Sequence, residues 1–166
     1  MSPLWDYFWP VLGVGLVLGL VSGLAAFRRT RRRWPIIGVA AVLTLAAAAL
    51  WHGPLGAAER FRDSVETAAR TSLTAYEMTQ VHAHLQHDPL TRRLLLSGPA
   101  DEFQTTELVR ILSTLPGVSR ATWSPQERDL PLFVEALLVS AGGFLLGLIV
   151  AYLVELRRRY NAQWSW

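Results

Sequence analysis

Three long apolar stretches limit what this chain of 166 residues can fold into. Residues 7–27 and 34–51 carry no charged side chain, and residues 130–156 carry only two, both glutamates near the ends of the stretch. A helix needs roughly 20 apolar residues to cross the hydrocarbon core of a bilayer. The pattern therefore predicts a membrane protein with three transmembrane helices, at residues 7–27, 35–51 and 131–154.

Arginines gather at one end of these predicted helices. Five lie in the predicted loop 28–34, and three follow the third helix in the predicted tail 155–166. Short loops rich in arginine stay in the cytoplasm. We therefore expect a bacterial inner-membrane protein whose C-terminus is cytoplasmic and whose N-terminus and central segment are periplasmic. The same arginines are candidates for contact with anionic membrane lipid: Arg28, Arg29, Arg31, Arg32, Arg33, Arg157, Arg158 and Arg159.

The charge of the central segment argues against a nucleic-acid partner. Residues 52–129 contain eight arginines and ten acidic residues, which leaves a net charge of −2. A domain that binds nucleic acid needs a basic patch on a folded surface. The positive charge of the whole chain belongs instead to the short loops beside the predicted helices.

Small residues recur at intervals of four in the first and third predicted helices. Such stripes let helix backbones approach closely inside a membrane. Two interpretations stay open: packing among the helices of this chain, or contact with a larger energy-transducing membrane complex of which this chain is an accessory or assembly subunit. A transporter or channel component is disfavoured because no predicted helix has a polar stripe. The small residues are Gly15, Gly19, Gly23, Gly143, Gly147 and Ala151.

Glu135 is the one ionisable residue that falls inside an apolar stretch close to a helix start. Intramembrane acids often have a function in ion or proton movement. Glu135 follows Leu130 and Pro131, so we expect it in the first turn of its helix, where the helix dipole favours an acid. A structural role is favoured over a proton or ion role.

The central segment predicts a small α+β domain outside the membrane, over residues 57–123. Residues at steps of three and four form one apolar face and predict a helix: Ala58, Phe61, Val65, Ala68, Ser72 or Leu73, and Tyr76. Residues 81–86 alternate between apolar and polar, which is typical of a half-buried strand. A turn then leads into a second strand over residues 92–97, antiparallel to the first.

A second helix and a third strand are expected after Ser97. Asp101 and Gln104 have the spacing of a capping box at a helix start. Phe103, Leu108, Ile111, Leu112 and Leu115 would face the core before the helix stops at Pro116 and Gly117. Residues 118–123 would form the last strand, which gives the element order α-β-β-α-β.

This order, together with "LLLSG" and "LPGVSRATW", resembles the BON (bacterial OsmY and nodulation) domain. The motif positions are Leu96, Ser97, Gly98, Pro116, Gly117 and Val118. The resemblance implies an α/β sandwich in which two helices cover one face of a three-stranded sheet. It also implies a non-catalytic module that contacts phospholipid or other envelope components. The chain departs from the family where "HDPLTRRLLL" stands in place of a glycine and a valine-rich strand.

Residue chemistry offers no convincing catalytic or metal site. His82 and His84 would project from one face of a strand, with His87 in the turn, and three imidazoles can hold zinc or copper. A solvated strand face explains the same pattern, and no acid or cysteine with ligand spacing supports a metal. Ser97 lacks the surroundings of a nucleophile. We expect no cofactor and no enzyme, but a binding or scaffolding protein with lipid, envelope or membrane-protein partners.

Overall fold

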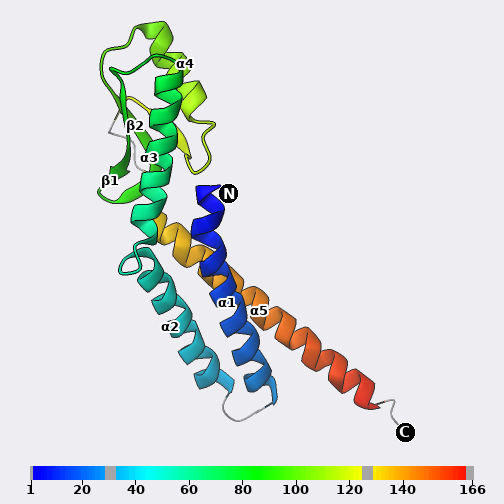
Figure 1. Ribbon diagram of the computed structural model, residues 1–166. Coiled ribbons are helices and arrows are strands. Elements are labelled where there is room, and N and C mark those ends of the chain that lie inside the picture. The colour runs from blue at the N-terminus through cyan, green and yellow to red at the C-terminus, as the bar shows by residue number, and fades with distance from the viewer. Residues whose placement is uncertain (1, 29–32, 125–128, 164–166) are drawn as a thin grey trace. The chain divides into compact units, whose positions relative to one another are not determined.

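The computed structural model describes residues 2–28, 33–124 and 129–163. Within these residues the chain forms five helices and three strands (Figure 1). They are α1 (Pro3–Arg28), α2 (Arg33–His52), α3 (Ala57–Ala75), β1 (His82–His87), β2 (Leu90–Ser97), α4 (Glu102–Leu112), β3 (Arg120–Thr122) and α5 (Leu132–Gln163).

Three of the helices, α1, α2 and α5, are long and apolar enough to cross a membrane. The structure therefore confirms the predicted number of long apolar helices and the presence of a small α+β domain. In α5, Glu135 and Glu155 enclose the uncharged part of the helix and lie twenty residues apart. At 1.5 Å per residue this interval measures about 30 Å, the thickness of a hydrocarbon core.

The chain divides into two compact units. The α+β unit comprises Met1–Tyr7 and Gly56–Glu135, and the helical unit comprises Phe8–Leu55 and Ala136–Trp166. The unit boundaries fall inside α1 and α5, so the first turns of both helices belong to the α+β unit. In one of these turns the ring of Tyr7 packs on that of Phe61 in α3, with centroids 5.5 Å apart.

The sheet of the α+β unit has the strand order β1-β2-β3. β1 and β2 are antiparallel, as the sequence predicts, whereas β3 runs parallel to β2. Leu85, Leu94 and Ala121 are cross-strand neighbours, and each is at most 1% exposed. They therefore form the strand side of the core, and α3 lies against β1 while α4 lies against β3.

α3 buries a narrower face than the sequence predicts. The buried residues are Ala57, Phe61, Val65, Ala69 and Leu73, each four positions after the last. The expectation was right for Phe61, Val65 and Leu73 and wrong for Ala58, Ala68 and Tyr76, which are not buried. Alanines at 57 and 58, and again at 68 and 69, are equally apolar, so the sequence pattern alone does not select the buried one. The predicted Tyr76 follows the helix as its C-cap and is 55% exposed.

The start of α4 confirms the predicted capping box. Asp101 accepts a hydrogen bond from the Gln104 backbone nitrogen at 2.7 Å, and the Gln104 side chain accepts one from the Asp101 nitrogen at 3.1 Å. Phe103 was expected in the core, and this was wrong because its side chain is 75% exposed. The buried residues of α4 are Leu108 and Leu112, one turn apart, so the core face does not extend back to the first turn.

Two predicted boundaries also shift. β2 begins at Leu90 rather than at residue 92, because Leu90 and Thr91 still pair with neighbouring backbone. The predicted tail 155–166 is helical as far as Gln163. Glu155 accepts a hydrogen bond from Nε of Arg159 at 3.2 Å, an i,i+4 pair of the kind that prolongs helices beyond their apolar part.

Candidate functional site

Arg92 on β2 joins three parts of the α+β unit. Its Nη1 donates to Oε2 of Glu135 in the first turn of α5 at 3.1 Å, and its Nε donates to the Gly117 carbonyl at 3.2 Å. Both side chains of the ion pair are less than a quarter exposed. Glu135 lies in the first turn of α5, as its sequence position predicted, whereas its ion pair with Arg92 is a contact that sequence reasoning missed.

The backbone around Arg92 reinforces this junction. The Ser119 nitrogen donates to the Arg92 carbonyl oxygen at 2.8 Å, which holds the segment before β3 against β2. Thr91 pairs with Pro131, one residue before α5 begins. The entry into α5 is therefore part of the folded α+β unit and not a free linker.

A carboxylate beside this junction is stabilised in its charged form. The Ser119 hydroxyl donates to Oδ2 of Asp129 at 2.7 Å, and the Leu130 nitrogen donates to Oδ1 at 2.8 Å. The Ser119 hydrogen bond lowers the pKa of Asp129 below its ordinary value, and the Leu130 donor and the charges of Arg92 and Arg120 act in the same direction. Partial desolvation opposes them.

The motif residues that carry the BON resemblance occupy turns and core positions. Leu96 is buried and Ser97 ends β2, while Gly98 adopts a φ of +127° against the Gln80 carbonyl. Gly117 has a φ of +101°, and a Cβ there would lie 2.9 Å from Cγ2 of Val65 in α3. Residues other than glycine rarely adopt a backbone conformation with either of these positive φ values.

The remaining residues of the second motif divide between core and surface. Val118 is buried and Pro116 is exposed. The motif therefore shapes the fold, and nothing in its geometry forms a binding surface by itself.

One edge of the sheet is partly covered by α3. Oε1 of Glu66 accepts a hydrogen bond from the backbone nitrogen of Leu85 in β1 at 3.0 Å. An unpaired strand edge is a common place for another chain to add a strand. The Glu66 carboxylate removes one of the donors that such a partner would need.

The histidines of β1 do not assemble a metal site. The rings of His84 and His87 stack with centroids 6.4 Å apart, and His82 is exposed at the start of the strand. Among the described residues no group of three His, Cys, Asp or Glu side chains could hold a metal ion.

The glycine stripes of α1 and α5 face each other within the helical unit. A Cβ at Gly15 would clash with the Ser140 carbonyl, and one at Gly19 with the Phe144 carbonyl. A Cβ at Gly143 would lie 2.5 Å from the Leu12 carbonyl oxygen, and a Cβ at Gly147 would clash with the Leu16 carbonyl. The two backbones therefore approach as closely as small residues allow.

The same contact continues toward the C-terminal end of α1, where Gly23 meets Ala151 of α5. A Cβ at Gly23 would lie 2.6 Å from that of Ala151, which is itself fully buried. The stripes are thus used inside this chain, and contact with a larger complex would need other faces.

Of the arginines predicted to face the cytoplasm, those that the structure describes lie near helix ends. Arg28 is the last residue of α1, Arg33 is the first of α2, and Arg157, Arg158 and Arg159 are exposed in the last turns of α5. Arg29, Arg31 and Arg32 lie outside the described residues. Arg159 also donates from Nη2 to the Phe27 carbonyl at 3.3 Å, which joins the ends of α5 and α1.

Comparison with protein-family models, curated proteins and solved structures finds no match. The BON resemblance therefore stays a prediction from the sequence motifs. The function has to be argued from the residues and from the way in which the two units are connected.

Proposed function

We propose that the chain is a non-catalytic inner-membrane protein that presents a BON-like α+β unit to the periplasm as a binding or scaffolding module. The observation that carries the proposal is where the unit is inserted along the chain. α2 begins at Arg33 and ends at His52, and α3 starts five residues later at Ala57. α5 begins within the α+β unit and carries Arg157, Arg158 and Arg159 close to its other end, at Gln163.

In the chain, one apolar helix on each side separates the α+β unit from the arginines of the predicted cytoplasmic loop and tail. The positive-inside rule then assigns the arginines to the cytoplasm and the α+β unit to the opposite face. Attachment through two helices suits a module that is held near a membrane surface. Its partner would be lipid, another envelope component or another membrane protein.

Phe103 is the best reporter for such a partner. It is 75% exposed in the first turn of α4, and aromatic residues, phenylalanine included, are enriched in the cores of protein interfaces. Its backbone is fixed by the Asp101 capping box one turn long. An exposed aromatic on a well-defined helix start is a suitable position for a probe.

The test is photo-crosslinking of the full-length protein in native membranes. A photoreactive amino acid at position 103 should give a discrete cross-linked product, and one at position 160, near the arginine end of α5, should not give the same product. Both positions are exposed, at 75% and 61%, so accessibility is matched. Identical products at both positions, or none from position 103 or other exposed positions of the α+β unit, would contradict the binding role.

A further inference from the structure

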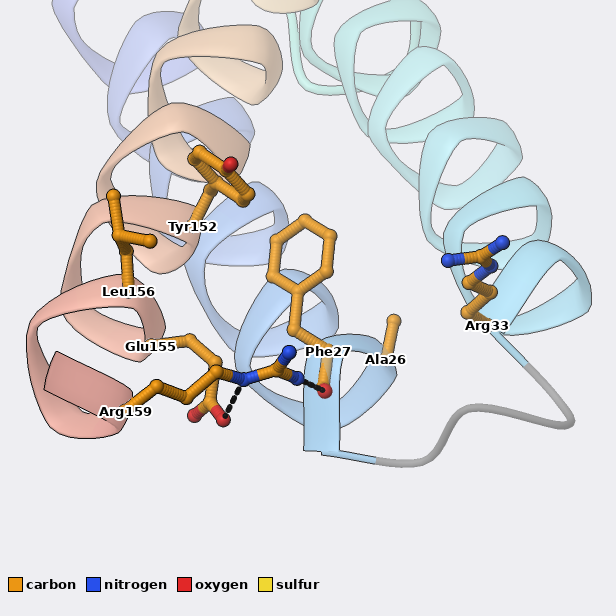
Figure 2. A pocket seen from close by; sticks show the side chains of 7 residues that line it. All are labelled: Ala26, Phe27, Arg33, Tyr152, Glu155, Leu156 and Arg159. Carbon is orange, nitrogen blue, oxygen red and sulfur yellow. Dashed lines mark hydrogen bonds and ion pairs between the residues drawn. The ribbon is translucent and has the colours of Figure 1, made fainter. Parts of the chain in front are cut away.

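A pocket of about 290 Å³ lies among the last turn of α1, the start of α2 and the last part of α5, where arginines gather. It is entirely inside the helical unit. Figure 2 shows Phe27 in the middle of the lining, with Arg33 on one side and Tyr152 and Arg159 on the other. The complete lining is Ala26, Phe27, Arg33, Tyr152, Glu155, Leu156 and Arg159.

We propose that this pocket binds the phosphodiester headgroup of an anionic phospholipid, with Arg33 and Arg159 as the cationic contacts. Guanidinium groups present several donors to a phosphate and remain charged at all relevant pH values. The pocket stands at the ends of helices long enough to span a bilayer, which is the depth of lipid headgroups. This proposal requires that α1, α2 and α5 insert into a membrane, and it does not depend on whether the α+β unit binds a partner.

Arg159 is held in place by two neighbours. It donates from Nε to Glu155 and from Nη2 to the Phe27 carbonyl, at 3.2 and 3.3 Å (Figure 2). Glu155 is engaged a second time by Arg158 at 3.9 Å. The carboxylate thus positions the guanidinium, and the described arginines at this end still outnumber the one glutamate by four. The surplus favours an anionic lipid over a zwitterionic one.

The rest of the lining suits the apolar part of a lipid. The rings of Phe27 and Tyr152 meet edge to face with centroids 5.8 Å apart. From the pocket, a row of exposed apolar side chains follows one face of α5 back toward the middle of the helix: Leu156, Tyr152, Ile149 and Leu145, each more than half exposed. These positions step by four, three and four residues, which keeps them on one helix face. An acyl chain can lie along this row while the phosphate occupies the pocket.

The test is lipid binding to the full-length protein, followed by native mass spectrometry after purification in detergent. Phosphatidylglycerol and phosphatidylethanolamine are added in parallel, with glycerol phosphate as a soluble source of the same phosphate chemistry. We expect a retained phosphatidylglycerol adduct, weaker retention of phosphatidylethanolamine and no adduct with glycerol phosphate. Equal retention of the two lipids, or equal binding of glycerol phosphate, would overturn the proposal.

Variants localise the site. Arg159→Gln and Arg33→Gln should each weaken phosphatidylglycerol binding by about tenfold, the effect of losing one charge-assisted contact. Arg157→Gln removes the same charge from the same end of α5 but lies outside the pocket, so binding should fall much less. Because Arg33 and Arg159 come from different helices, a folding defect in one variant does not decide the result. A loss as large in Arg157→Gln as in both pocket variants would show a general surface charge effect and no site.

Discussion

Arg92 of β2 and Glu135 of α5 form an ion pair with 3.1 Å between Nη1 and Oε2, although 43 residues separate them. Each side chain is mostly shielded from solvent, with 24% and 21% exposed. The pair links the central strand of the sheet to the first turn of the last apolar helix. Together with the bridge between Thr91 and Pro131, it joins the start of α5 to the sheet of the α+β unit.

A double-mutant cycle tests this pair. Arg92→Gln and Glu135→Gln should each lower the free energy of unfolding, and the cycle should give a coupling energy of about 1 kcal/mol, since the pair is partly buried. The measurement is thermal or denaturant unfolding of the full-length protein in detergent. The exposed i,i+3 pair Glu107–Arg110 is the matched control, and its coupling should be about 0.5 kcal/mol or less. Equal coupling in the two pairs would argue against a special role for Arg92.

The packing of α1 on α5 predicts a sharp contrast between a glycine inside this contact and a glycine outside it. Gly19→Ala should destabilise the helical unit by about 1–3 kcal/mol, because the added methyl group meets the Phe144 backbone. Gly142→Ala should be neutral or slightly stabilising, since nothing lies within 4 Å of a Cβ there and alanine favours helix. Unfolding of each variant in detergent checks this.

The same variants distinguish packing inside the chain from contact with a larger complex. On a native gel, Gly19→Ala should change the stability of the single chain without releasing it from any partner. Release from a complex at unchanged stability of the chain itself would instead support the accessory-subunit interpretation.

Asp129 predicts an acid-sensitive contribution to stability. Its pKa is lowered in the folded protein by the Ser119 hydroxyl first of all, so the folded state favours the charged carboxylate. The stabilisation is present above the pKa of the unfolded chain, about 4, and is lost as the pH falls through the lower folded value. Ser119→Ala should therefore lower the melting temperature slightly at pH 7, because Asp129 is exposed.

The pH dependence separates this effect from simple loss of a side chain. The difference between Ser119→Ala and the parent protein should shrink as the pH falls from about 4, the pKa of the unfolded carboxyl group, through the lower pKa of the folded parent, because below that pH the carboxyl group is protonated in both proteins. Asp129→Asn should remove the same part of the pH dependence. A difference that stays constant from pH 7 down to pH 3 would show that the Ser119 hydroxyl acts independently of the carboxylate charge.

Local patterns predicted much of this fold. Uncharged runs located the three apolar helices, alternation located β1, and the spacing of Asp101 and Gln104 located the start of α4. These signals are contained within a few neighbouring residues. Phe103 was wrongly predicted to be buried. Periodicity shows which apolar residues share a helix face, but it does not show how far along the helix that face is covered by the rest of the domain.

The candidate sites depend more on tertiary contacts, which the sequence does not display. Arg92 lies on a strand and its partner lies in a helix 43 residues later, and the pocket at the arginine end combines residues of three helices. The sequence singled out Arg33 and Arg159 as charges near a membrane surface. It gave no sign that Glu155 and the Phe27 carbonyl oxygen accept hydrogen bonds from Arg159 and hold it in place in the pocket that Tyr152 also lines.

The orientation of the α+β unit is the central claim, and cysteine accessibility tests it most directly. The chain has no cysteine, so single-cysteine variants at His87, in the α+β unit, and at Ala162, near the end of α5, need no background correction. In bacterial spheroplasts, a membrane-impermeant maleimide should label His87→Cys at once and Ala162→Cys only after lysis. Labelling of Ala162→Cys in intact spheroplasts, with His87→Cys labelled only after lysis, would contradict the account.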